Sequence, residues 1–114
     1  MNSALLRIFV LLATVPFVAV SADMTMSATA FALHGRTASG VQAQRGIVSA
    51  DPRILPLGTV IRVKGAGRYS GTYVVADTGP QIHGMEIDIH VPTEGEARRF
   101  GRKRVRVHVL QRAK

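Results

Sequence analysis

From residue 28 onward the chain is a series of short runs rich in apolar and β-branched residues, separated by glycine, proline and small polar residues. Runs of this length and composition, bounded by turn residues, predict β-strands. We predict six strands, at Ala28–Leu33, Gly46–Ala50, Thr59–Lys64, Gly71–Asp77, Met85–Val91 and Lys103–Leu110. The pattern therefore predicts a mainly β fold, and a small barrel accommodates this number of short strands.

Two of the runs alternate strictly between apolar and polar residues, which predicts one buried and one outward face. In the run 85–91 the apolar face consists of Met85, Ile87, Ile89 and Val91, and the other face of Glu86, Asp88 and His90. In the run 103–110 the apolar face consists of Val105, Val107 and Val109, and the other face of Arg104, Arg106 and His108. We therefore expect Asp88 to point away from the core, toward solvent or a cleft.

One short helix is predicted between the last two strands. Thr93 followed three residues later by Glu96 forms a capping-box pattern, in which the threonine caps the helix start. The helix is expected at Glu94–Phe100 and ends at Gly101, since glycine favours a helix C-terminus.

The first 22 residues are expected to lie outside the folded domain. Arg7 precedes an apolar run, Ile8–Val20, which is short of the roughly 20 residues that a membrane span needs. Small residues follow at 20–22, so the segment 1–22 is predicted to be a cleaved secretory signal peptide, with an uncleaved anchor as the alternative. Residues 23–114 then form a single domain.

The chain has no cysteine, which excludes both disulfides and a lipid anchor on cysteine. Small exported domains usually depend on disulfides because their cores are small. A closed six-stranded barrel is a plausible substitute, because closure leaves no free strand edge.

Positive charge is in excess. The net charge of the whole chain is +8, and it becomes +7 for residues 23–114, since Arg7 is the only charged residue before them. Such a surface favours anionic partners, here cell-wall polymers, anionic lipid surfaces or extracellular nucleic acid, although it could simply be a solvated basic face. Specific nucleic-acid binding is disfavoured, because aromatic residues are scarce after residue 22, namely Phe31, Tyr69, Tyr73 and Phe100.

Three aspartates occupy strand ends or a strand: Asp51, Asp77 and Asp88. If barrel closure brings them into one cleft, their mutual repulsion and burial would raise a carboxyl pKa, as a general acid requires. Each also has an ordinary explanation. Asp51 and Asp77 could cap turns, and Asp88 could be an outward residue on a half-exposed strand.

Two other kinds of chemistry compete for the same residues. Asp77-Thr78-Gly79 after an apolar run is also typical of aspartic proteases, including dimeric ones, but Pro80 follows and no flap-like hairpin is evident. The three carboxylates with His83 or His90 could bind a divalent cation. No dense metal-ligand motif is present, so we expect neither a metal nor another cofactor.

An ordered series of motifs runs through the chain. It consists of Thr37-Ala38-Ser39-Gly40, residues 46–52 (GIVSADP), residues 55–59 (LPLGT), Asp77-Thr78-Gly79, Ile82-His83-Gly84, Ile87-Asp88-Ile89, and Glu96-Ala97 with Phe100-Gly101. This series resembles the three-aspartate (3D) domain family over about residues 28–111. The family shares a double-psi β-barrel with the catalytic part of membrane-bound lytic transglycosylase A, so the resemblance implies that fold here.

The resemblance implies that Asp77 is the catalytic acid and base of a lytic transglycosylase. The reaction would cut the β-1,4 bond between N-acetylmuramic acid and N-acetylglucosamine in peptidoglycan and give a 1,6-anhydro product. Because the nucleophile is the sugar's own C6 hydroxyl, one carboxylate suffices, whereas a hydrolase would need two. Asp51 and Asp88 would support Asp77 by tuning its pKa or binding sugar hydroxyls.

The resemblance also implies a set of substrate-contacting positions: Thr37, Ser39, Gly40, Thr78, Gly79, His83, Gly84 and His90. Two of them depart from the family pattern. His83 stands where the family commonly has lysine, and His90 where it commonly has tyrosine, which removes a fixed cation and a sugar-stacking ring. Basic residues toward the C-terminus (Arg98, Arg99, Arg102, Arg104 and Arg106) could compensate by attracting an anionic wall.

The expected protein is thus an exported, monomeric peptidoglycan-active enzyme of the periplasm or cell wall. The alternative is a non-catalytic cell-wall carbohydrate-binding module, as in the expansin-like barrels that share this fold.

Overall fold

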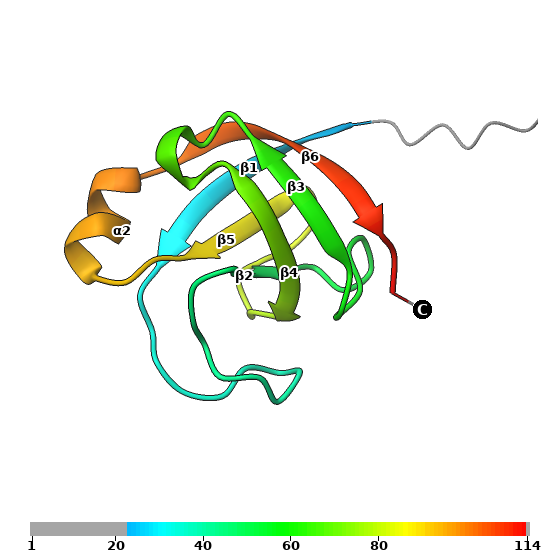
Figure 1. Cartoon of the computed structure of the whole chain (residues 1–114), viewed down its shortest axis with the longest axis horizontal. Coiled ribbons are helices and arrows are strands. Elements are labelled where there is room, and N and C mark those ends of the chain that lie inside the picture. Colours follow the sequence, from blue (N-terminus) through cyan, green and yellow to red (C-terminus); the bar gives the residue numbers. More distant parts are fainter. Residues whose placement is uncertain (1–22, 114) are drawn as a thin grey trace, which may run out of the picture.

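A computed structural model describes residues 23–113 (Figure 1). The predicted signal peptide, residues 1–22, lies outside the described residues. Six strands form the domain: β1 (Met24–Phe31), β2 (Ile47–Ala50), β3 (Val60–Lys64), β4 (Gly71–Asp77), β5 (Glu86–His90) and β6 (Lys103–Gln111). They close into a barrel in the order β1-β5-β2-β4-β3-β6. Closure pairs every strand on both sides, so no edge remains open.

The barrel is mixed. Strand β1 runs parallel to β5, and β2 runs parallel to β4, while the other four pairings are antiparallel. Each parallel pair is separated in sequence by other elements, as a crossover connection requires. The predicted mainly β, six-stranded barrel is confirmed, and these pairings are consistent with a double-psi topology.

The core lies inside the barrel and is filled by the inward-facing residues, which alternate with outward-facing ones along the strands. Strand β5 contributes Ile87 and Ile89, and β6 contributes Val105 and Val107, all at most 2% exposed. The alternation predicted for these two strands is therefore confirmed at its centre. The prediction that Met85 belongs to the buried face is wrong. Met85 precedes β5 and is 43% exposed, because the pairing of β1 with β5 begins at Glu86.

Strand β1 is longer at its start than predicted and ends earlier. It begins at Met24 rather than Ala28, because residues 24–28 pair with β6 while 27–31 pair with β5. A strand in contact with two neighbours on one barrel is stabilised by both ladders, which local composition does not reveal. The loop predicted around residues 65–67 also continues into a short 3-10 helix, η1 (Gly67–Tyr69).

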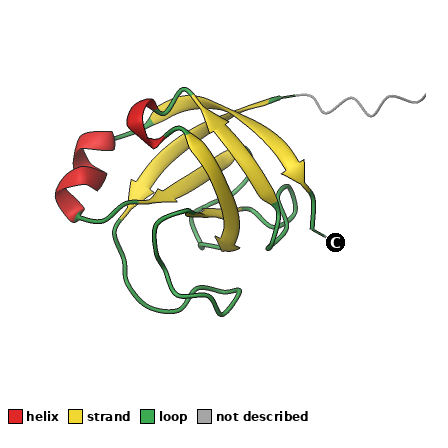
Figure 2. Cartoon of the chain, in the orientation of Figure 1, coloured by secondary structure: helices red, strands yellow, loops and turns green. Residues whose placement is uncertain are grey.

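Within residues 23–113 the one α-helix is α2 (Glu94–Phe100), as predicted (Figure 2). Thr93 Oγ1 accepts a hydrogen bond from the Glu96 backbone N–H at 3.1 Å, and Gly101 ends the helix with φ 65°. Phe100 anchors the helix in the core cluster. No helix in the described part of the chain is long and apolar enough to cross a membrane.

Candidate functional site

Polar residues form a row across the outer face of four neighbouring strands, β1, β5, β2 and β4. Ser49 on β2 pairs with Asp77 on one side and with Asp88 on the other, and Asp88 pairs in turn with Thr29 on β1. Directly paired residues point to the same face of a sheet. Since neighbouring strands lie about 4.8 Å apart, the backbones at Asp77 and Asp88 are roughly 10 Å apart across β2.

Asp77 ends strand β4 and is held through one of its oxygens. Its Oδ1 accepts hydrogen bonds from the backbone N–H groups of Ala38 at 2.8 Å and Thr78 at 2.9 Å. No hydrogen bond from the described residues reaches its Oδ2. The half-buried carboxylate is therefore fixed in orientation and presents one oxygen to an incoming group.

The loop at residues 37–40 reaches Asp77 from a distant part of the sequence. The Ser39 N–H donates to the carbonyl of Ala76 at 3.1 Å, beside the Ala38 contact. Thr37 is buried, and its hydroxyl donates to Val41 O at 2.7 Å. Gly40 has a φ of 87°, a conformation that glycine adopts without steric cost. Of the predicted substrate-contacting residues of this loop, Ser39 thus lies next to Asp77, whereas the Thr37 side chain bonds within the loop.

Asp51 connects its own turn to the loop at Gly84 through hydrogen bonds. Its side chain is 3% exposed and accepts hydrogen bonds from both Nε and Nη2 of Arg53, at 3.0 and 2.7 Å. The backbone N–H groups of Arg53 and Gly84 donate to it as well, at 3.0 and 2.8 Å. The Arg53 guanidinium, followed by the Gly84 backbone N–H, holds the pKa of Asp51 far below its usual range. A carboxylate so occupied stays ionised and fixes the loop that follows Asp77.

Asp88 is in the opposite situation. Thr29 Oγ1 donates to its Oδ1 at 2.9 Å, and this is the one side-chain hydrogen bond that the described residues provide. Burial raises the pKa of the Asp88 carboxyl, and the Thr29 hydrogen bond offsets part of that effect. Asp88 lines a pocket of about 200 Å³ together with Gln81 and Ile82, which belong to the loop after Asp77.

That loop carries the other predicted positions, Thr78, Gly79, His83 and Gly84. His83 is exposed, and its Nε2–H donates to Pro80 O at 2.6 Å, so the ring packs back on its own loop. A Cβ on Gly79 would lie 3.0 Å from Ile82 Cγ1, so a larger residue there would require the Ile82 side chain to shift. Within the described residues no hydrogen bond joins any two of Asp51, Asp77 and Asp88.

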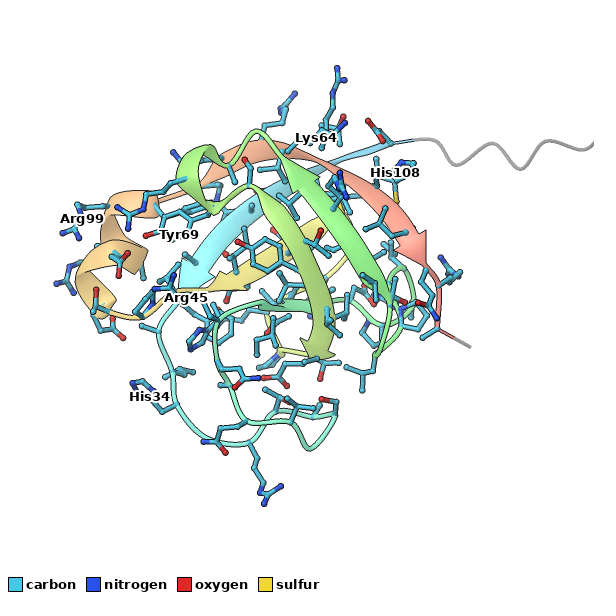
Figure 3. All side chains as sticks on the ribbon, in the orientation of Figure 1. His34, Arg45, Lys64, Tyr69, Arg99 and His108 are labelled. Atoms are coloured by element: carbon cyan, nitrogen blue, oxygen red, sulfur yellow. The ribbon has the colours of Figure 1, made fainter. Side chains whose placement is uncertain are left out.

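His90 lies apart from this arrangement. The alternation of residues 85–91 predicted His90 on the outward face, but that prediction was wrong, because the side chain is 7% exposed. The ring packs edge-on against Phe31, and Nε2–H donates to Leu33 O at 3.2 Å. Burial lowers the pKa of His90, which favours the neutral ring. It lines a different pocket together with Arg45 and Tyr69. Figure 3 shows Arg45 and Tyr69 on the α2 side of the barrel.

Several residues of the site were not singled out from the sequence: Thr29, Ala38, Ser49 and Arg53. Arg53 had a local signal, because a basic residue two positions after Asp51 can fold back on it. Ala38 and Ser49 fell within the motif series without a predicted role, and Thr29 had no signal, since its proximity to Asp88 depends on strand register. Among residues 23–113 no cluster of three potential ligands could hold a metal ion.

The fold and site define a small closed β-barrel with ordered carboxylates at neighbouring strand ends. A family model described as the 3D domain matches residues 46–111, which is more than half of the chain. The chain therefore belongs to the 3D domain family.

Two curated relatives come from Bacillus subtilis. The putative cell wall shaping protein YabE is 35% identical over 96 residues, covering 76% of this chain and 23% of that protein. The cell wall-binding protein YocH is 34% identical over 99 residues, covering 79% of this chain and 33% of that protein. The chain thus matches a third or less of the length of either relative.

Similar solved structures are those of MltA from Escherichia coli, described as a lytic transglycosylase fold. One covers 72% of this chain and 29% of MltA, with 27% identity and a TM-score of 0.59. Another, determined with bound chitohexaose, has 26% identity over the same shares and the same TM-score. The expected relation to this barrel is confirmed.

Proposed function

We propose that this protein is a peptidoglycan-cleaving enzyme of the lytic transglycosylase type. One observation carries the proposal: Asp77 has one oxygen anchored by two backbone N–H groups and the other without a partner among the described residues. A fixed carboxylate with one available oxygen is the geometry that general acid–base catalysis requires. Similarity to MltA and to relatives named for the cell wall supports the same class of substrate.

In the proposed reaction, Asp77 in its protonated form donates its proton to the glycosidic oxygen between N-acetylmuramic acid and N-acetylglucosamine. The bond from C1 of the muramic sugar to that oxygen breaks, and positive charge develops on the sugar ring. The C6 hydroxyl of the same sugar then attacks C1, and its proton returns to Asp77. The products are a 1,6-anhydro sugar end and a free 4-hydroxyl, so neither water nor a cofactor is consumed.

The other two aspartates take different supporting roles. Asp51 acts as a positioning residue, because its oxygens are occupied by Arg53 and Gly84 and cannot approach substrate. Asp88, half-buried beside a pocket, can accept sugar hydroxyls or stabilise the developing positive charge. Thr78 and Ser39 lie next to Asp77, and His83 is exposed on the loop that follows it; all three are proposed to contact the glycan.

The test is digestion of purified sacculi with the domain 23–114, followed by mass analysis of the soluble products. The wild type should release anhydro-muropeptides, and Asp77→Asn should reduce the release by at least about 100-fold, the lower range for loss of a catalytic proton donor. Equal release by both proteins, or hydrated reducing ends in place of anhydro ends, would contradict the mechanism.

A second function is favoured by the name of one relative, cell wall-binding protein YocH. If the domain is a binding module, it should sediment with sacculi and release nothing, and Asp77→Asn should sediment equally well.

In either case we propose that the segment 1–22 directs export and that the protein acts at the cell envelope as a monomer. The dimeric aspartic protease alternative predicts peptide cleavage at acid pH.

A further inference from the structure

The outer face of β1 carries a hydroxyl at every second position. Thr25, Ser27 and Thr29 face outward, while Met26 and Ala28 between them lie in the core. With a rise of about 3.3 Å per residue, the three hydroxyls extend over roughly 13 Å along one strand. They form a polar row that could contact a linear polymer along its length.

Three pockets follow this row and overlap at shared residues. The first, of about 430 Å³, and the second, of about 330 Å³, share Thr25 and Arg104. The second and the third, of about 200 Å³, share Ser27 and Arg102. Because neighbouring pockets share lining residues and the third contains Asp88, the three pockets form a row, here called the β1 groove, that runs from Thr25 to the candidate site.

One end of the β1 groove is strongly basic. Lys64 on β3 pairs directly with Arg106 on β6, and Arg104 pairs with Ser27. Like charges placed opposite one another on one face destabilise a sheet. Within the described residues none of Lys64, Arg104 and Arg106 forms a salt bridge, so no acidic side chain of the domain neutralises them. Figure 3 shows Lys64 extending outward from the barrel.

The other end is acidic, and Arg102 marks the boundary. Its Nη1 donates to Ser27 Oγ at 2.9 Å and to Glu86 Oε2 at 3.4 Å. Glu86 and Asp88 follow on β5, next to Ser27 and Thr29 on β1. The polarity of the groove therefore matches a polymer that carries negative charges at one end of the contact and hydroxyls along it.

We propose that the β1 groove binds a carboxylate-bearing glycan strand and guides it to Asp88. Carboxylates of the glycan contact Arg104, Arg106 and Lys64, and its hydroxyl and amide groups contact the three hydroxyls of β1. The direction toward Asp88 rests on the proposed function, whereas the binding itself does not. The floor of hydroxyls favours a saccharide over a lipid surface, which would need an apolar or flat contact.

The experiment measures binding by calorimetry to a tetrasaccharide of alternating N-acetylglucosamine and N-acetylmuramic acid, with neutral chitotetraose as the matched probe. All variants carry Asp77→Asn, so that the probe stays intact. The double change Arg104→Gln and Arg106→Gln should weaken binding of the charged probe by roughly tenfold, since it removes two exposed cations that contact carboxylates of the probe. Binding of chitotetraose should change by less than about twofold, because it carries no charge.

The matched control removes the same charge elsewhere, through Arg62→Gln and Arg112→Gln, which line none of the three pockets. A second variant, Thr25→Trp, fills the groove at an exposed position and should weaken both probes. Equal losses from the two double variants would overturn the proposal, as would unchanged binding by Arg104→Gln/Arg106→Gln or Thr25→Trp. Absence of anhydro products from the wild type would contradict the catalytic proposal and leave these binding results standing.

Discussion

At the scale of single residues, the three aspartates of similar sequence context acquire three different environments. Asp51 accepts four hydrogen bonds, Asp77 accepts two through one oxygen, and Asp88 accepts one in a half-buried position. A shared motif series therefore does not imply a shared role. Residue type gave the possible chemistry, while the number and direction of donors around each carboxylate determines which part of it is available.

The ionised state of Asp51 should stabilise the fold. Its pKa is lowered in the folded protein, so its contribution is present above the unfolded value of about 3.9 and is lost as the pH falls below it. We expect Asp51→Asn to lower the urea midpoint clearly at pH 7 and by less at pH 3. An equal loss at the two pH values would contradict the assignment. Arg53→Gln, which removes the main partner, is the companion variant and should behave alike.

Asp88 should show the opposite sign. Burial raises its folded pKa, so ionisation costs stability at pH values above that pKa, and the cost disappears as the pH falls through it. Asn keeps an acceptor for Thr29 and removes the charge. Asp88→Asn should therefore raise the unfolding midpoint at pH 7 and leave it unchanged at pH 3. A lower midpoint at pH 7 would show that the charge is stabilised by its surroundings.

At the scale of elements, the loops position the site that the strands carry, and the helix is held by contacts of its own. The loop 37–40 gives Asp77 a backbone donor, and Gly84 ties the following loop to Asp51. Helix α2 is fixed at its start by Thr93, while Tyr69 donates a short hydrogen bond to the Glu96 carboxylate. Tyr73 extends this contact by donating to Tyr69 O.

Loss of the helix cap should have a measurable but moderate effect. Thr93→Ala removes the acceptor for the Glu96 N–H and should lower the free energy of unfolding by about 1 kcal/mol. In a domain of this size that corresponds to a fall in Tm of roughly 4–8 °C by differential scanning calorimetry. Thr93→Ser keeps the acceptor and should stay near the wild type. An unchanged Tm in Thr93→Ala would show that Tyr69 holds the helix alone.

At the scale of the whole molecule, the basic excess distinguishes one side of the barrel from the candidate site. Arginines of α2 and β6 are exposed, and three residues of the β1 groove have no acidic partner among the described residues. The acids at the other end of the groove, Glu86 and Asp88, lie on β5. Because of this asymmetry, we expect the basic end of the groove to face an anionic polymer.

Binding to the cell wall should therefore depend on salt. The screening length falls from about 10 Å at 0.1 M to about 3 Å at 1 M ionic strength, so attraction between exposed charges is largely lost. We expect co-sedimentation of the domain with sacculi to decrease steadily over this range, and co-sedimentation with neutral chitin to remain nearly constant. Salt-independent binding to sacculi would contradict a role for the basic face.

The sequence by itself determined the strands at 47–50, 60–64, 71–77, 86–90 and 103–111 to within two residues at each end, and the helix at 94–100. It did so because alternation, turn residues and capping act within a few neighbouring positions. It also pointed to the three aspartates through an ordered motif series. Only the tertiary structure decided three features: the start of β1, the burial of His90 and the hydrogen bond between Gly84 and Asp51. Each depends on which strands become neighbours when the barrel closes, and closure brings together residues tens of positions apart whose local sequence carries no record of the pairing.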